Sequence, residues 1–411
     1  MLTRMTRCTR TFPLALALAL AAATVAVSSP RALALDEDHY KLAQSMIDRA
    51  IEYLRTQQDE ETGGWSVPER GPTLPAITGL VVNGMIMDPR IDETDPAIAR
   101  GVEYILSFRK EDGGIYDRIL PSYNTSICLS ALSRVRTPEA VAAIRPAQDF
   151  LRSTQWSEDM APDIEQEAGG VEAGVGPDHP FYGGVGYGRH GRPDNSNLHF
   201  MIQALHDSGL SCDDPAFQRA LVFLERTQMH EDVNDMAYAR GSRQGGFIYA
   251  TSPDRESLGE GQSMAGEFEE TLADGTTATR LRAYGSMTYA GFKSYIYAQL
   301  DRDDPRVQHA YDWIRRNYRL QENPGMGAQG LYYYFVTFSR AMEAWGLPTI
   351  ETLTPEGSIR ETRYWANDLI AQLAELQQED GSFQNLHDRW MEGDDVLVTA
   401  YALLALQHAI R

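Results

Sequence analysis

The stretch WANDLIAQLAELQQEDGSFQN (residues 365–385) decides the fold. Its apolar residues recur at steps of four and three with polar residues between them, which predicts a helix that buries one face. Gly381 ends this helix, because glycine readily adopts the left-handed conformation common at helix C-termini. The later segment VLVTAYALLAL (residues 396–406) is apolar on nearly every side and predicts a helix that is buried all round. The two segments therefore predict one helical hairpin.

The same plan recurs along the chain. The other predicted amphipathic segments are residues 43–66, 97–117, 143–156, 217–229 and 307–322, and the buried segments that follow them are 74–86, 123–135, 195–209, 284–300 and 330–346. One hairpin alone would leave its buried helix partly uncovered, so neighbouring hairpins must pack on it. The last buried segment is as apolar as the middle ones and lacks the polar face of a capping repeat. We therefore predict an all-α fold, an (α/α)6 toroid of six hairpins with an inner and an outer ring of helices.

Two insertions interrupt this pattern. An acidic, glycine-rich insertion occupies residues 157–181, and a second contains Asp274-Gly275 between partly alternating runs. The second predicts a small β-hairpin near residues 266–285. We expect the glycine turns of all the hairpins to lie on one rim of the ring, with the insertions shaping its mouth.

Residues 1–34 have the pattern of a signal peptide. Three arginines precede an apolar run, residues 14–27, and small residues at Ala32 and Ala34 suit a cleavage site after Ala34. We expect an exported protein, periplasmic or extracellular, whose mature part, residues 35–411, is a single toroid domain. No later stretch reaches the roughly 18 apolar residues that a membrane helix needs, so we expect no stable membrane span.

The charge balance bears on possible partners. The chain has 37 basic and 58 acidic residues and a formal net charge of −21. Such a surface repels nucleic acid and anionic membranes, so neither is expected as a partner. Cys128 and Cys212 remain after cleavage, without a CxxC pattern, and a disulfide between them is not favoured. The sequence leaves the oligomeric state open.

Three stretches carry a family resemblance: IEYLRTQQDEETGGW (51–65), VEYILSFRKEDGGIY (102–116) and IAQLAELQQEDGSFQ (370–384). They resemble the QW-type repeats of the prenyltransferase and squalene oxidase repeat superfamily. This superfamily includes squalene-hopene cyclases, protein prenyltransferase beta subunits and many exported bacterial proteins. The stretch RWMEGDDVLVTAYALLAL (389–406) looks like the exported bacterial branch. The resemblance spans the mature chain and implies a toroid that acts on or binds an isoprenoid or other lipid in a central cavity.

The resemblance also implies candidate catalytic residues. Class II terpene cyclases of this superfamily protonate an alkene with the middle Asp of a DxDD motif. Here Glu392-Gly393-Asp394-Asp395 gives ExDD, in which Asp394 would be the proton donor beside Asp395 and Glu392. Clustered carboxyl groups can keep one acid neutral, because two cannot both ionise cheaply in a dry cavity. A structural interpretation stays open, in which Asp394 or Asp395 caps the helix that begins at Val396.

Aromatic side chains of the buried segments are candidates for a substrate pocket, since their π faces suit carbocations and flat apolar ligands. The pocket candidates are Tyr289, Tyr332, Tyr333, Tyr334, Trp390 and Tyr401. A run of three tyrosines cannot all face the same way, so only part of residues 332–334 is expected in the pocket. The other inner aromatics, expected to be mostly core, are Tyr284, Tyr295, Tyr297, Phe335, Phe338 and Trp345.

Two other functions stay open. A polysaccharide hydrolase or lyase on an (α/α)6 toroid would pair Asp394 or Asp395 with Asp194 or Glu267. A non-catalytic scaffold would bind a partner through its rim loops.

No cofactor or metal is expected. P-loop, dinucleotide-binding and HExxH patterns are absent from the sequence. The zinc triad of prenyltransferase beta subunits is not reproduced, because no Asp precedes Cys128 at the required spacing. His190 and His199 flank Asp194 and could hold a metal with it, but surface and helix-capping roles are expected for these three residues.

Overall fold

The computed structural model describes residues 35–160, 174–188, 191–272 and 274–411. The expected signal peptide and the middle of the 157–181 insertion lie outside these ranges. In the described part of the chain, no helix is long and apolar enough to cross a membrane.

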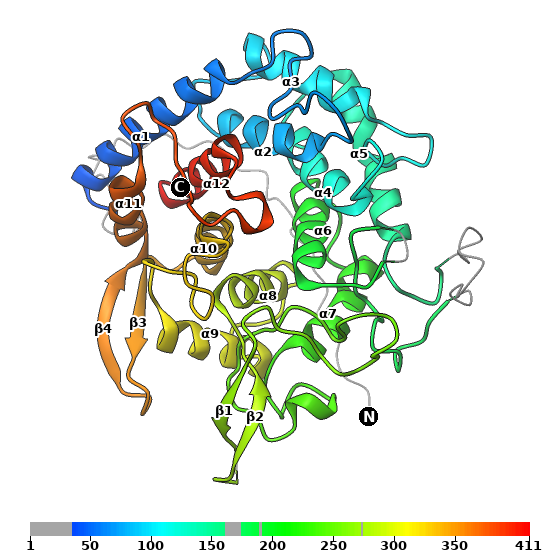
Figure 1. Ribbon diagram of the computed structural model, residues 1–411, viewed down its shortest axis with the longest axis vertical. Helices are drawn as coiled ribbons and strands as arrows, with labels where there is room; N and C mark the ends of the chain where they lie inside the picture. The colour runs from blue at the N-terminus through cyan, green and yellow to red at the C-terminus, as the bar shows by residue number, and fades with distance from the viewer. Residues whose placement is uncertain (1–34, 161–173, 189–190, 273) are drawn as a thin grey trace, which may run out of the picture.

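Two concentric rings of helices make up the molecule (Figure 1). The inner ring consists of α2 (Pro75–Ile86), α4 (Pro121–Leu132), α6 (Asn195–Asp207), α8 (Gly285–Tyr297), α10 (Leu331–Trp345) and α12 (Asp395–Ala409). The outer ring consists of α1 (Glu37–Thr56), α3 (Pro96–Ser107), α5 (Pro138–Ser153), α7 (Pro215–Thr227), α9 (Pro305–Asn317) and α11 (Trp365–Leu376). Each inner helix contacts the next, and α12 contacts α2. The predicted (α/α)6 toroid is therefore confirmed.

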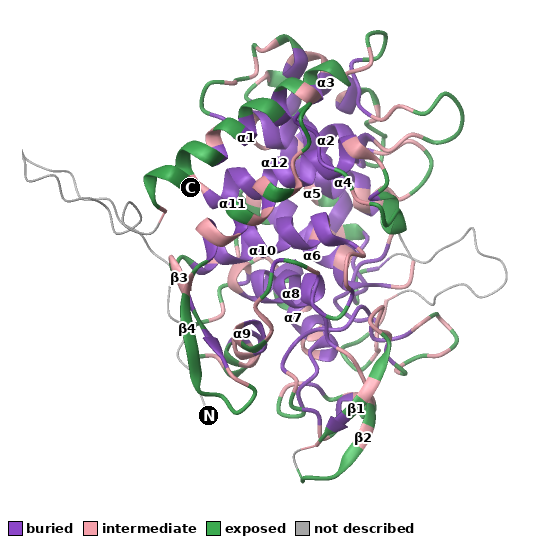
Figure 2. Ribbon diagram, turned by 60° about the vertical axis from the view of Figure 1, so that its left-hand side comes forward, coloured by how far each residue is buried: buried purple, intermediate pink, exposed green. Residues whose placement is uncertain are grey.

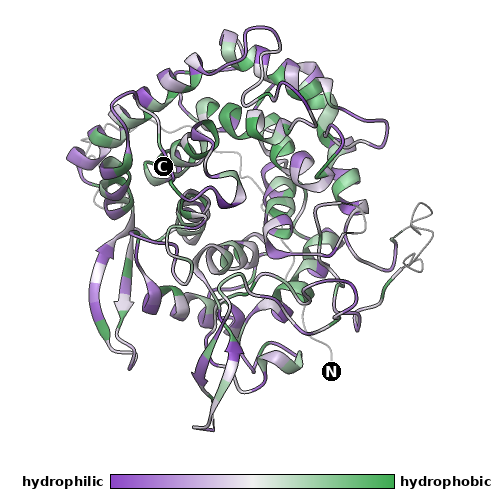
Figure 3. Cartoon of the chain, in the orientation of Figure 1, coloured by the Kyte–Doolittle hydropathy of each residue, from purple (hydrophilic) through white to green (hydrophobic). Residues whose placement is uncertain are grey.

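Burial follows the two patterns that the sequence shows. Every residue of α12 from Val396 to Ala409 is buried, whereas α11 buries only one face. Figure 2 shows the same contrast between the buried inner helices and the half-exposed outer ones. In Figure 3 hydrophobic residues cover most of the inner ring, and hydrophilic residues alternate with them along the outer helices.

In four of the turns that follow an outer helix, a glutamine side chain links that hairpin to the next one by hydrogen bonds. Gln155 donates from Nε2 to the backbone oxygen of Gly183 in its own turn, at 2.9 Å, and to that of Ala216 in α7, at 3.0 Å. Gln58, Gln228 and Gln377 make the equivalent pair of hydrogen bonds in their own turns. These bonds satisfy backbone carbonyls that the packing would otherwise bury without partners.

The glycine turn itself has a steric reason. Gly381 has φ +91°, and a Cβ built there would lie 2.4 Å from the backbone oxygen of Arg49 in α1. Glycine alone permits both the backbone conformation and this close approach. The next residues lead to the inner helix, where the backbone N–H of Phe383 donates to Thr399 Oγ1 at 2.9 Å. Since every such turn joins an outer helix to the start of an inner one, the turns lie on one rim, as predicted.

The ends of the chain meet and close the ring. Gln377 Nε2, after α11, donates to the backbone oxygen of Met46 in α1 at 3.0 Å. Gln407 Nε2, in α12, donates to the backbone oxygen of Gly84 in α2 at 3.3 Å. The last hairpin thus packs on the first, and no buried helix of the ring is left with an open face.

Two β-hairpins extend from the helical rings (Figure 1). The predicted one pairs β1 (Glu267–Thr271) with β2 (Thr277–Leu281), and its turn is held by the Asp274 carboxylate, which accepts from the Thr276 N–H. The second pairs β3 (Thr349–Leu353) with β4 (Ile359–Tyr364) between α10 and α11 and was not predicted. Cys128 and Cys212 are both free thiols.

Candidate functional site

A cavity of about 160 Å³ lies at the end of the inner ring where the helices begin. Ile77, Tyr123, Ser196, Tyr333 and Leu397 reach it from the first turns of five different inner helices. The rest of the wall comes from the segments that lead into those helices. The lining is mainly aromatic and aliphatic, so the cavity favours an apolar ligand.

Three of the predicted pocket residues line this cavity: Tyr333, Trp390 and Tyr401. Tyr284, which was expected to be core, lines it too. The sequence analysis missed Tyr123, Tyr187, Phe200 and Tyr249. Tyr123 and Phe200 belong to predicted inner helices and could have been found from their aromatic character. Tyr187 and Tyr249 follow the glycine turns of the third and fourth hairpins, where no helical period indicates the direction of a side chain.

The other tyrosines predicted for the pocket lie elsewhere. Successive residues of a helix point about 100° apart, so only one of the run at 332–334 faces the cavity. Tyr332 donates from its hydroxyl to the backbone oxygen of Gln384, and Tyr334 donates to that of Arg319 beyond α9. Tyr289 packs against Tyr334 between the two rings, with its ring centroid 5.6 Å away. These three tyrosines belong to the core and not to the pocket.

Glu392 is the acidic residue of the predicted motif that lines the cavity, and its side chain is buried. Its Oε1 accepts from the backbone N–H of Tyr333 at 2.8 Å, and its Oε2 accepts from Asn385 Nδ2 at 2.6 Å. The N-cap residue of α10 is Gly330, which has no side chain. Glu392, which belongs to a different segment, therefore accepts a hydrogen bond from the start of this helix in its place.

Burial determines the protonation of Glu392. Removal from water raises its pKa to about 7, against the opposing effect of the N–H groups of Tyr333 and Asn385. A carboxyl group with such a pKa is partly protonated at neutral pH. It can therefore act as a proton donor inside the cavity.

The two aspartates of the motif do not reach the cavity wall. Asp394 caps α12 by accepting from the backbone N–H groups of Val396 and Leu397 at 2.9 and 3.1 Å. Asp395 accepts from Gln384 Nε2 at 2.9 Å. The capping interpretation of Asp394 is confirmed, and of the three acids in the motif it is Glu392 that lines the cavity. The reason is geometric, because helix capping directs Asp394 back toward its own helix.

The mouth of the cavity has a strained backbone. Trp390 and Met391, in the short helical turn η3 (Arg389–Met391), have φ values of 58° and 65° and are 42% and 48% exposed. Leu120, at the start of α4, has φ 52°. Bulky residues in this left-handed region are outliers that cost about 1–3 kcal/mol each and gather at ligand sites. All three line the cavity.

Tyrosine hydroxyls make part of the wall polar. Tyr123 and Tyr401 bring their hydroxyls within 3.5 Å, as do Tyr249 and Tyr187. The Tyr333 hydroxyl lies 3.2 Å from His199 Nδ1. The 3.5 Å contact leaves the Tyr123 and Tyr401 hydroxyls able to bind a polar group of a ligand.

The remaining predicted acids do not complete a carboxylate pair in the cavity. Asp194 is buried behind Tyr249, and burial raises its pKa to about 6 despite hydrogen bonds from Asn197. Both of its oxygens accept from Asn197, one from the backbone and one from the side chain, so Asp194 caps α6 as expected. Glu267 is exposed in β1.

His199 is not at the surface, contrary to expectation. It is buried in α6, and burial lowers its pKa well below the usual value. Its Nδ1 lies 2.9 Å from the backbone oxygen of Ser196. His190 lies outside the described residues. Within the described ranges one group of three side chains could hold a metal, His230, Asp232 and His309 on the outer ring. The two imidazole rings of this group stack face to face, 3.5 Å apart, so their lone pairs do not converge on one point.

The comparisons with known proteins support the fold. No family model and no curated protein sequence matches the chain. Among solved structures, it is similar to the GH76A alpha-1,6-mannanase from Salegentibacter sp. HEL1_6, with 9% identity, a TM-score of 0.53, and coverage of 90% of this chain and 99% of that one. It is also similar to a variant of the type II terpene cyclase MstE from Scytonema in complex with merosterolic acid A, with 13% identity, a TM-score of 0.47, and coverage of 91% and 98%. The likeness to the mannanase concerns the toroid fold alone.

Proposed function

We propose that this protein binds an unsaturated apolar ligand of the isoprenoid class in the aromatic cavity and that Glu392 donates a proton to it. One observation carries the proposal: a buried carboxyl group, with its pKa raised to about 7, lines a wall that is otherwise aromatic, aliphatic or hydroxylated. A neutral acid beside apolar surface can protonate a carbon–carbon double bond without a cofactor.

The aromatic wall of the cavity suits the steps that follow the proton transfer. When the Glu392 proton adds to the alkene, the π electrons form the new C–H bond and positive charge develops on the neighbouring carbon. The faces of Tyr333, Tyr401 and Trp390 can stabilise that cation. Loss of a proton from an adjacent carbon to the Glu392 carboxylate then completes an isomerisation. Alternatively, attack by a second double bond closes a ring and moves the positive charge to a new carbon, which loses its proton in the same way.

Cavity size limits what can enter. A cavity of about 150 Å³ holds roughly one benzene ring, so the observed 160 Å³ accommodates one end of a prenyl chain. The remainder of a longer ligand would leave through the mouth beside Trp390 and Met391, which are both partly exposed. Hydroxyl groups of the tyrosines would bind a polar end group.

A polysaccharide enzyme is the second candidate. The raised pKa values of Asp194 and Glu392 favour it, since such enzymes use a neutral acid and a second carboxylate. Against it, Asp194 does not line the cavity, so it forms no carboxylate pair there with Glu392. The geometry therefore favours the apolar ligand.

Ligand binding separates the two functions. We expect farnesol to raise the melting temperature of the wild type and of Glu392→Gln alike, because the substitution removes the acid but keeps the shape of the side chain. Glu375→Gln, at an exposed position of α11, serves as the matched control. α-1,6-Mannotriose should have no effect. Stabilisation by mannotriose without stabilisation by farnesol would replace the proposal with the polysaccharide function.

A further inference from the structure

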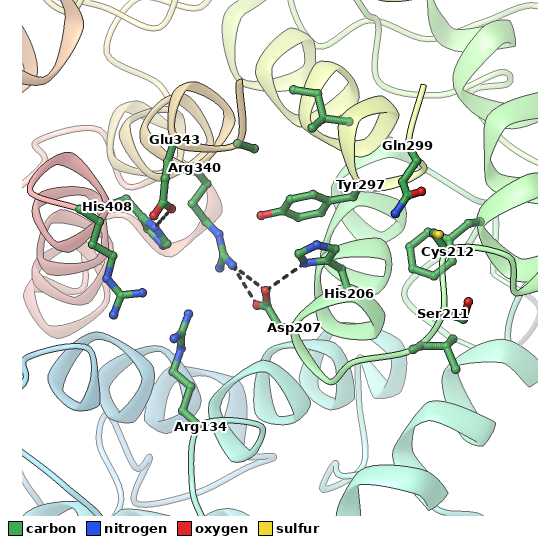
Figure 4. Close-up of a pocket in the computed structure, with 15 residues that line it drawn as sticks. Arg134, His206, Asp207, Ser211, Cys212, Tyr297, Gln299, Arg340, Glu343 and His408 are labelled. Atoms are coloured by element: carbon green, nitrogen blue, oxygen red, sulfur yellow. Dashed lines mark hydrogen bonds and ion pairs between the residues drawn. The ribbon is translucent and has the colours of Figure 1, made fainter. Parts of the chain in front are cut away.

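A second and larger pocket lies at the opposite end of the ring (Figure 4). It has a volume of about 710 Å³ and is lined by residues at or beyond the last turns of the inner helices. Asp207 ends α6, Tyr297 ends α8, and Arg340 lies in the second half of α10. Small-molecule sites commonly occupy roughly 300–1,000 Å³, so this pocket has room for a metabolite.

Three guanidinium groups enter this pocket from different segments. Arg134 follows α4, Arg340 belongs to α10, and Arg411 follows α12. In Figure 4 the side chains of Arg134 and Arg340 point toward the same space beside Asp207. We call the space bounded by Arg134, Arg340, Arg411 and Asp207 the arginine pocket.

The charges in the arginine pocket do not cancel. Asp207 and Glu343 are the two carboxylates that line it, against three guanidinium groups. Burial would raise the pKa of Asp207, but Arg340 holds it below its usual range, so it is ionised. His408 is uncharged at neutral pH, because burial lowers its pKa to about 4 in spite of its bond to Glu343. The side chains of the lining therefore carry three guanidinium charges against two carboxylate charges, on a chain whose formal net charge is −21.

Among the residues that the structure describes, donor groups of two arginines in this pocket have no protein partner. Arg134 uses Nε to bond Asn83 Oδ1 at 2.7 Å, which leaves its two terminal nitrogens facing the pocket. Arg340 is 4% exposed and bonds Asp207 through Nη2, while its Nε is buried without a partner. A buried donor without an acceptor costs about 1–3 kcal/mol, and an anion would supply the missing acceptors.

Arg134 also differs from Arg340 in its electrostatic environment. Burial lowers the pKa of Arg134, whereas the nearby Asp207 outweighs burial at Arg340 and raises its pKa. The charge on Arg134 is thus incompletely compensated by the protein. Guanidinium groups bind carboxylate and phosphate in a bidentate geometry, which would complete that compensation.

We propose that the arginine pocket is a second ligand site, which binds a small anionic molecule through a carboxylate or phosphate group. The group would bond Arg134 and Arg411 from the open side and approach Arg340 beside Asp207. This inference concerns the face opposite the aromatic cavity and does not depend on the function proposed for that cavity.

A purely structural explanation competes with this one. The C-terminal ends of the inner helices carry partial negative charge, and arginines near such ends stabilise them. That effect accounts for the presence of cationic side chains. It predicts no affinity for anions, because the arginines would then already be neutralised by the helix ends.

Titration of the whole protein with inorganic phosphate and, separately, with succinate distinguishes the two explanations. Calorimetry at low ionic strength should give saturable binding of at least one anion to the wild type. Arg134→Gln and Arg411→Gln should each weaken it by about tenfold or more, since each removes a charged hydrogen bond. Arg411 is exposed, so its substitution should leave the fold intact. The exposed Arg240, near β2 at the other end of the ring, provides the control Arg240→Gln, which should bind as the wild type does.

Each result of these titrations either supports or overturns the proposed anion site. Phosphate alone, succinate alone or both can bind, and each result supports the site while identifying the preferred anion group. Absence of saturable binding overturns it. Equal affinities in the wild type, Arg134→Gln and Arg411→Gln overturn it as well, because the anion would then lie elsewhere.

Discussion

At Glu392 two opposing effects act on one carboxyl group. Burial favours the neutral acid, and the N–H groups at the start of α10 favour the carboxylate. Burial prevails, so the folded protein binds this proton more tightly than the unfolded chain does. The group therefore contributes stability that is complete below its ordinary pKa of 4.5 and is lost as the pH rises toward 7.

This linkage gives a prediction for Glu392→Gln, which mimics the protonated acid at every pH. Between pH values of about 4.5 and 7, the free energy of unfolding of the wild type should fall relative to the variant by about 3 kcal/mol. Urea unfolding at a series of pH values measures the difference. A difference that does not change with pH would mean that Glu392 titrates normally and cannot serve as the proton donor.

Met391 gives a second prediction. Its backbone is left-handed, with φ 65°, and its side chain is half exposed at the mouth of the cavity. Met391→Gly should raise the free energy of unfolding by about 1 kcal/mol, because relief of strain exceeds the entropy cost of glycine. Met391→Ala keeps the strain and should not stabilise the protein. If both variants are destabilised equally, packing of the methionine outweighs its strain.

The sequence located the acidic motif but not the roles of its members. The resemblance assigned the proton to Asp394, whereas the preference of Asp for helix caps predicts the observed bonds to Val396 and Leu397. Which carboxyl group faces the cavity depends on the backbone path of residues 389–392. Two residues of this segment have a left-handed backbone conformation, which no periodic sequence pattern predicts.

At the scale of elements, the glutamines Gln58, Gln155, Gln228 and Gln377 each link the turn of one hairpin to the next hairpin. Gln377 bonds its own turn and α1, while its neighbour Gln378 is exposed and bonds only the adjacent backbone. Gln377→Ala should lower the free energy of unfolding by about 2 kcal/mol, because two buried carbonyls lose their donor. Gln378→Ala should change it by less than about 0.5 kcal/mol. Equal effects of the two substitutions in urea unfolding would refute the fastening role.

Elements were predictable where a period runs over many residues. In the described part of the chain, the twelve α-helices of the two rings follow spacings visible in the sequence, since one buried face or full burial needs a definite pattern. The strands of the β3–β4 hairpin are too short to show a clear period. The turn sequence Pro355-Glu356-Gly357 was the pattern from which this hairpin could have been predicted. The aromatic wall from Tyr187 and Tyr249 depends on loops, whose course follows from packing rather than from local sequence.

At the scale of the whole molecule, the ring sets the positions of both sites. The six inner helices run in the same direction, so their first turns meet around the aromatic cavity and their last turns meet around the arginine pocket. Closure by Gln377 and Gln407 joins the first and last hairpins. The need to cover six apolar helices made this closure predictable. Of the residues lining the aromatic cavity, Tyr333, Trp390, Tyr401 and Glu392 were predicted, whereas the arginine pocket was not.

Proton transfer in heavy water tests the central claim most directly. Farnesol incubated with the wild type in D2O should yield a product that carries deuterium on carbon, because Glu392 exchanges its proton with solvent and then delivers it to the double bond. Glu392→Gln, which still binds farnesol, should give no labelled product, while Glu375→Gln should label it as the wild type does. Mass spectrometry of the extracted prenyl compounds reads the result. Equal labelling by the wild type and Glu392→Gln, or no labelling by the wild type, would contradict the account.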